Sequence, residues 1–67
     1  METEELDDIK VNDIYAHKKS GNLYRVTCIT KMKHPDNGKW IDCVIYEDVV
    51  HFESWVRSLD NFRNNFI

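Results

Sequence analysis

The sequence predicts a small all-β fold, an SH3-like, partly open barrel of about five antiparallel strands that ends in a short C-terminal helical turn. Three observations predict it. Stretches rich in β-branched and aromatic residues recur along the chain, turn residues separate them, and the last apolar residues are spaced three and four apart. A chain of 67 residues, 42% of them hydrophobic, is enough for one compact core. We therefore expect a single domain over residues 9–67.

The N-terminal segment, residues 1–8, carries several acids and no base. We expect it to be a flexible acidic tail; an arm that mimics phosphates or shields the basic side is the alternative. Met1 is followed by glutamates and not by basic residues and an apolar run, so no signal peptide is expected. No apolar stretch approaches the roughly 20 residues that span a bilayer. These features predict a cytoplasmic protein with reduced thiols and no membrane partner.

The first strands are expected on either side of a polar hairpin loop. Residues 14–17 predict a short strand, and 18–22 form a turn in which Gly21 can take a positive φ. Residues 23–32 alternate most regularly and predict a longer strand. Its expected core face consists of Tyr24, Val26, Cys28, Thr30 and Met32. Ile29 breaks this alternation, which indicates either a bulge that turns it inward or a second apolar patch.

The second half predicts a hairpin and a closing segment. Residues 33–39 contain Pro-Asp-Asn-Gly and predict a loop, and 40–50 predict a second long strand region. Whether Glu47 and Asp48 kink one bent strand or make a hairpin turn stays open. Residues 55–57 predict a closing strand, and Ser58 is a suitable N-cap for a short helix. Leu59, Phe62 and Phe66 would lie on one face of that helix.

These motifs resemble the DUF 1653 family, short bacterial and phage domains of unknown function. The matching blocks are Tyr15-x-His17-Lys18-x-x-Gly21-Asn22-x-Tyr24-x-Val26, Val44-Ile45-Tyr46 and Trp55-Val56-Arg57-x-Leu59-x-x-Phe62, within residues 11–63. The sequence departs from the family pattern by an extra residue in the 18–21 turn, by Ser58 in place of a proline, and by a rearranged 47–54 connector. The resemblance implies a phage or bacterial origin and an SH3-like fold, but no activity.

Residue types that form catalytic or metal sites in other proteins occur in this sequence without the spacing of a known motif. There is no nucleophile with a base, no pair of catalytic carboxylates, and two glycines provide no phosphate loop. We therefore expect no catalytic residues and no enzyme. Histidines and cysteines are far apart, without a C-x-x-C or H-x-x-x-H pair. The residues considered as ligands are His17, Cys28, His34, Cys43 and His51. We expect no metal and no cofactor.

A mixture of aromatic and basic residues indicates a recognition surface instead. The expected binding residues are Tyr15, His17, Lys18, Arg25, Trp40 and Arg57. Trp40 is expected to be exposed, whereas Tyr24, Tyr46 and Trp55 are expected in the core. For Arg57 the alternative is a structural role, paired with one of the acids Asp42, Glu47 and Asp60 and stacked on an aromatic ring.

Net charge is −3, yet residues 17–39 hold six bases and one acid. We favour a small protein-interaction module, for example a phage or bacterial accessory protein that binds a host protein. Nucleic-acid binding through the basic region Lys18–Lys39 is one alternative. A homo-oligomer, such as a homodimer, that binds a small ligand is another, because exposed strand edges and apolar ends favour association.

Overall fold

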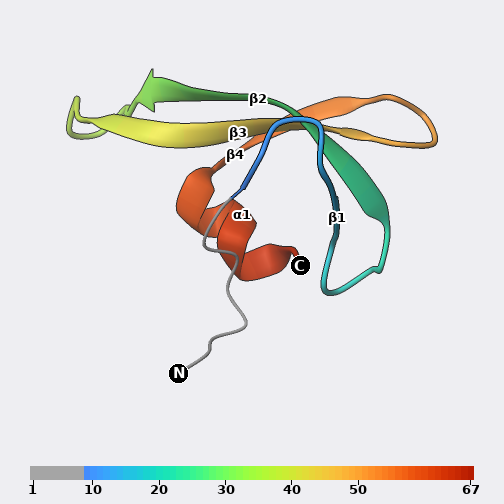
Figure 1. Cartoon of the computed structure of the whole chain (residues 1–67). Helices are drawn as coiled ribbons and strands as arrows, with labels where there is room; N and C mark the ends of the chain where they lie inside the picture. The colour runs from blue at the N-terminus through green and yellow to red at the C-terminus, as the bar shows by residue number, and fades with distance from the viewer. Residues whose placement is uncertain (1–8) are drawn as a thin grey trace.

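The computed structural model describes residues 9–67 as one curved antiparallel sheet with a helix on its concave face (Figure 1). The strands are β1 (Ile14–Ala16), β2 (Leu23–Lys33), β3 (Trp40–Asp48) and β4 (Ser54–Ser58), and α1 (Leu59–Asn65) follows β4 directly. The strands lie in the order β1-β2-β3-β4. The small all-β fold with a C-terminal helical turn is thus confirmed. The acidic segment 1–8, predicted to be a flexible tail, lies outside the described residues.

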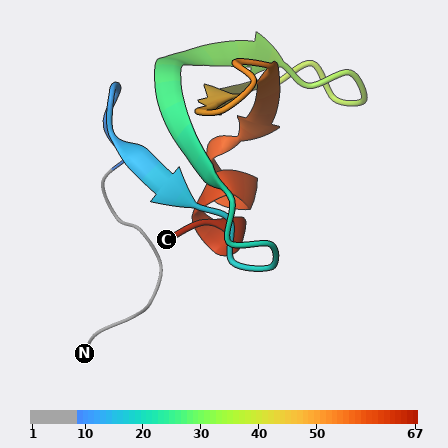
Figure 2. The same cartoon turned by 90° about the vertical axis from the view of Figure 1, so that its right-hand side faces the viewer.

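The sheet is open and has four strands, so the prediction of about five strands in a partly open barrel is corrected. Trp40–Asp48 is one strand, and the hairpin turn into β4 follows directly after Asp48, so residues 40–50 contain no additional strand. Where a barrel would close, the end of the chain joins β1 instead. Ala16 and Ile67 exchange backbone hydrogen bonds of 2.8 and 2.9 Å, and Figure 2 shows the C-terminus beside β1.

A β-bulge at Thr27 reverses the alternation of β2. Val26 pairs with Tyr46 and Cys28 pairs with Ile45, which leaves Thr27 without a partner between them. Because the extra residue shifts the pleat, Ile29 lies opposite Val44 on the core side. The predicted bulge is therefore confirmed, and it turns Ile29 to the Val44 side of the sheet, where its side chain remains 38% exposed. The predicted core face is wrong beyond Val26: Cys28, Thr30 and Met32 are exposed on the opposite face.

The core lies between the concave face of the sheet and α1. Its fully enclosed side chains are Val26, Val44, Phe62 and Phe66, at 0% exposure. Phe62 and Phe66 stack at 4.1 Å between ring centroids with an interplanar angle of 4°. The remaining buried members of the cluster are Ile9, Tyr15 and Tyr46. Aromatic side chains therefore supply most of this small core, in line with the large area that each of them buries.

Helix α1 begins where Ser58 caps it. The Ser58 hydroxyl accepts a hydrogen bond of 3.2 Å from the Asn61 N–H, and Asp60 lies in the positive first turn, which confirms the predicted N-cap. We expect Ser58→Ala to lower the free energy of unfolding by about 1 kcal/mol, measured by urea denaturation. Ser54→Ala, at the exposed start of β4, is the control. Equal midpoints for the two variants would contradict the cap.

The β3–β4 turn is organised by the carboxylate of Asp48. One of its oxygens accepts hydrogen bonds from the N–H groups of Val50 (2.6 Å) and His51 (3.2 Å), and the other lies 3.2 Å from Nδ1 of His51. These hydrogen bonds lower the pKa of Asp48 below its ordinary value of 3.8, and the bond from the Val50 N–H has the largest effect. The folded state thus favours the ionised carboxylate.

The pH dependence of stability follows from the sign of this shift. A lowered folded-state pKa contributes stability that is fully present above the unfolded value of 3.8 and is lost as pH falls through the folded pKa. We expect Asp48→Ala to be less stable than the wild type at pH 7. The difference should narrow steadily below pH 3.8, as urea titrations at several pH values would show. A difference that stays constant down to pH 2 would refute this prediction.

Candidate binding pocket

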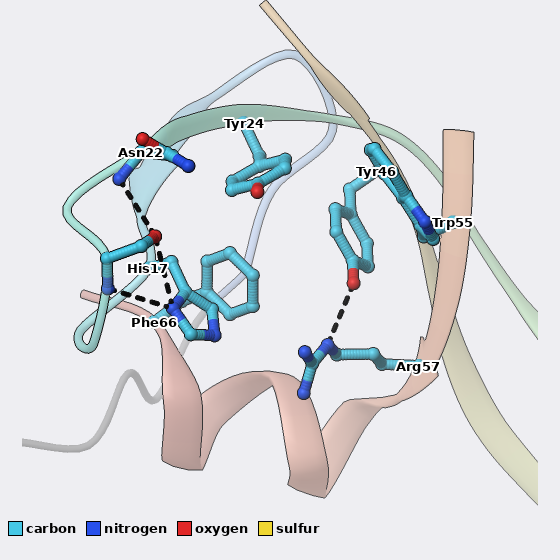
Figure 3. A pocket seen from close by; sticks show the side chains of 8 residues that line it. His17, Asn22, Tyr24, Tyr46, Trp55, Arg57 and Phe66 are labelled. Carbon is cyan, nitrogen blue, oxygen red and sulfur yellow. Dashed lines mark hydrogen bonds between the residues drawn. The ribbon is translucent and has the colours of Figure 1, made fainter. Parts of the chain in front are cut away.

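An open aromatic pocket lies where the concave face of the sheet meets the end of the chain. It has a volume of about 350 Å³. Its walls come from the β1–β2 turn, from three neighbouring strands and from the residue after α1 (Figure 3). The lining residues are His17, Ser20, Asn22, Tyr24, Tyr46, Trp55, Arg57 and Phe66. Such a combination of apolar walls and a few polar groups is typical of binding sites.

Strand register brings the aromatic walls together. Tyr46 and Trp55 are directly opposed on β3 and β4, and their rings are stacked at 6.1 Å. Tyr24 of β2 meets both rings edge-on, at 5.4 Å from Tyr46 and 5.9 Å from Trp55. Phe66 forms the floor, 5.5 Å from Tyr24. Edge-to-face packing on several sides holds these rings in fixed orientations.

Arg57 reaches into this pocket from β4. Its Nε donates a hydrogen bond of 2.8 Å to the Tyr46 hydroxyl, and its Nη1 donates to the side-chain oxygen of Asn61 on α1. The guanidinium carbon lies 5.5 Å from the centroid of the Phe66 ring. These contacts hold the guanidinium in place at the edge of the aromatic walls (Figure 3).

The β1–β2 turn positions His17 on the other side of Phe66. The turn closes through the Gly21 N–H, which donates to the His17 carbonyl at 2.7 Å, and Gly21 takes a φ of +77° that favours glycine. The Lys18 N–H donates to the Asn65 carbonyl, which ties the turn to the end of α1. The His17 ring meets Phe66 edge-on at 5.0 Å.

Of the six predicted binding residues, the structure brings His17 and Arg57 together in the pocket. Tyr15 is a core residue, 8% exposed, whose hydroxyl accepts a bond from the Lys10 N–H. Lys18 is exposed on the turn beside His17.

The other two residues lie elsewhere. Arg25 is on the opposite face of the sheet, paired with Glu47 at 3.2 Å. Trp40 is 64% exposed at the far end of β3, with Lys33 Nζ over its ring at 5.7 Å. The predicted exposure of Trp40 is confirmed, and its position is remote from the pocket.

The structural alternative for Arg57 is wrong in its partners. The three acids proposed for it are engaged elsewhere: Asp42 with Lys31, Glu47 with Arg25 and Asp60 with Arg63. Its position over the Phe66 ring agrees with the predicted aromatic contact. Among residues 9–67, Arg57 is therefore held by neutral groups and by an aromatic ring.

Sequence reasoning missed the walls of the pocket. The sequence predicts Tyr24 and Trp55 in the core, whereas Tyr24 is half-buried and Trp55 is 42% exposed. A usable signal is the hairpin itself, because the short 49–53 connector places Tyr46 and Trp55 on one face of neighbouring strands. Ser20 and Asn22 of the predicted 18–22 turn also line the pocket.

The cysteines and histidines form no metal centre in residues 9–67, since no three potential ligands cluster there. Cys28 is exposed and Cys43 is buried, both as free thiols. Cys28 pairs with Ile45 and Cys43 with Thr30, so the two cysteines are not direct partners. Within the same residues, no helix has the length and apolar character to cross a bilayer.

The chain matches no model of a known protein family, no curated protein and no solved structure. The resemblance to the DUF 1653 family therefore stays a prediction from the motifs named above. What the protein binds has to be argued from the pocket and its surroundings.

Proposed function

We propose that the protein is a small, non-enzymatic interaction module that binds an extended segment of a partner protein. The segment lies along β4 and places one side chain in the aromatic pocket. A cytoplasmic location, a phage or bacterial source and a host protein as partner belong to this proposal and rest on the sequence. The binding of an extended segment is supported by the residues of the pocket and by the edge of the sheet next to it.

One observation supports the proposal above the others: fixed aromatic rings and an arginine line one open pocket. Tryptophan, tyrosine and arginine are the residues that contribute most to binding energy at protein interfaces. Here Trp55, Tyr46 and Arg57 lie within two neighbouring strands, and the rings are held by edge-on contacts before any partner arrives. Preorganised side chains lose little conformational entropy on binding.

The free edge of the sheet lies next to this pocket. Within residues 9–67 no strand pairs with the outer side of β4, whereas the outer side of β1 is bonded to Ile67. An unpaired edge strand is a template for the backbone of an extended peptide. Because Trp55 and Arg57 point from β4 to the concave face, alternate side chains of an added strand would reach the pocket.

A second candidate function is nucleic-acid binding at the β2–β3 hairpin. The exposed Trp40 with Lys33 over its ring is a suitable platform for a stacked base. The basic residues, however, are divided between two ends of the sheet (Figure 1): Lys18 and Lys19 lie on the β1–β2 turn, and Lys31, Lys33 and Lys39 lie near the β2–β3 loop. This division favours the pocket over a single phosphate-binding surface.

Selection of a random-sequence peptide library displayed on phage, with the full chain as bait, tests the proposal. We expect a related set of peptides that bind the immobilised chain and remain bound in 0.5 M salt, because ring contacts are not screened as phosphate contacts are. Failure to enrich any common sequence would contradict the interaction module. An electrophoretic shift of single-stranded DNA at about 50 mM salt, lost at higher salt, would favour the second candidate.

A further inference from the structure

The positive charge of Arg57 has no opposite charge beside it among residues 9–67. Its side chain is half-buried, and it forms no ion pair in the described part of the chain. The other two arginines are paired with carboxylates, Arg25 with Glu47 and Arg63 with Asp60. Partial burial disfavours an unneutralised cation, and proteins usually compensate it with an opposite charge.

The guanidinium also has unused donors. Nε and Nη1 have neutral acceptors on Tyr46 and Asn61, and Nη2 has no acceptor among residues 9–67. Arg63 Nε is the sole buried nitrogen or oxygen without a partner in these side chains, so Nη2 of Arg57 is open to solvent. Tyr46 and Asn61 hold the guanidinium in place, and Nη2 can donate its N–H groups to a carboxylate oxygen.

His17 adds a second donor that faces the same space. Its Nδ1 lies 3.3 Å from the Ser20 backbone N–H, which donates to it. Because a backbone N–H can only donate, Nδ1 is the acceptor, and the neutral ring carries its proton on Nε2. Figure 3 shows Nε2 of His17 on the side of the ring that faces Arg57. The pocket thus presents N–H groups from both sides of Phe66.

We propose that the pocket takes a carboxylate group of the partner segment, bound by Arg57 and by Nε2 of His17. This inference rests on the proposed function and names the chemistry that the site selects. The rings of Tyr24, Tyr46 and Trp55 contact the carbon atoms that bear the carboxylate, and Nη2 of Arg57 donates to its oxygen. Either an acidic side chain or the carboxyl terminus of the partner supplies this group.

Aromatic walls alone would suggest the opposite ligand, since cages of tyrosine and tryptophan bind methylated ammonium groups. Arg57 decides between the two. Its cation lies over Phe66 and bonds to Tyr46, so a second cation in this space would meet a like charge within a few ångströms. The pocket is therefore selective for an anion with an apolar stem.

Binding of small capped peptides, followed in the ¹⁵N spectrum of the full chain, tests the inference. The probes are acetyl-Gly-Glu-Gly-amide and its Gln counterpart, acetyl-Gly-Gly-Gly with a free carboxyl terminus and its amide, and an amide-capped trimethyllysine tripeptide. We expect the acids to shift the Arg57 Nε–H and Trp55 indole signals at millimolar concentration, at least tenfold more tightly than their neutral counterparts. The Trp40 indole signal, at the far end of the sheet, is the internal control.

If the Glu peptide shifts the signals more strongly than the peptide with a free carboxyl terminus, an acidic side chain is the source of the carboxylate. The opposite result identifies the carboxyl terminus as the source. Equal response to acids and amides, a preference for trimethyllysine, or no response from any probe would overturn the proposal that the pocket binds a carboxylate. Those results leave the interaction module to be decided by the library selection, which does not depend on charge. Arg57→Lys keeps a positive charge but loses the planar guanidinium that Tyr46 and Asn61 hold in place, and it should lose most of the acid preference. Retention of the full preference by this variant would also contradict the assignment.

Discussion

Replacing Phe62 with alanine is expected to leave most of the protein unfolded at 25 °C. Phe62 is 0% exposed, stacks on Phe66 and meets Tyr15 and Tyr46 edge-on. Removing such a ring costs about 3–5 kcal/mol through lost burial and the cavity that remains. A domain of this size rarely has more than about 3–5 kcal/mol of stability. Near-UV circular dichroism and urea denaturation measure the result.

Two control variants make this prediction specific. Phe62→Leu keeps much of the buried volume and should cost clearly less than the alanine variant. Val50→Ala removes apolar atoms from a side chain that is 69% exposed on the β3–β4 turn, and its midpoint should stay near that of the wild type. If Phe62→Ala remained folded with a midpoint close to that of Val50→Ala, the aromatic core described here would be wrong.

Replacing Trp55 with alanine is expected to weaken binding of a library-selected peptide by more than about tenfold, the loss typical of a central aromatic residue at an interface. Trp55 is 42% exposed and forms a wall of the pocket, so its ring is available to a ligand. Its burial against Tyr24 and Tyr46 is partial, and the variant should remain folded. Calorimetric titration measures the affinity, and circular dichroism checks the fold.

Trp40→Ala is the matched control for this experiment. The two tryptophans are the same residue type on the same sheet, but Trp40 lies at the far end of β3 and outside the pocket. Its loss should leave peptide affinity unchanged within about twofold, the range of interface-remote substitutions. The reverse result, with binding lost in Trp40→Ala and kept in Trp55→Ala, would move the binding surface to the β2–β3 hairpin.

Local signals were sufficient for most of the secondary structure. The strand predicted at 23–32 is observed as Leu23–Lys33, and Ser58 caps α1 as its side chain and position indicate. These features depend on residues close in sequence, such as turn residues, alternation and a capping hydroxyl. The fold class therefore follows from the sequence with little knowledge of the tertiary structure.

The faces of the strands could not be predicted in the same way. The bulge at Thr27 depends on how β2 pairs with β3, and it exchanges the inward and outward positions of the β2 residues that follow it. Similarly, the partners of Arg57 are fixed by the register of β4 against β3 and by the position of α1. The pocket thus depends on pairings that the local sequence does not encode.

The most direct test of the account is a map of amide shifts in the full chain when a library-selected peptide is added. We predict that the largest shifts cluster on β4, on Tyr24 and on the turn that carries His17, with the Trp55 indole among them. Shifts confined to the β2–β3 hairpin around Trp40, or to the outer face around Val56 and Cys28, would contradict the aromatic pocket as the binding site.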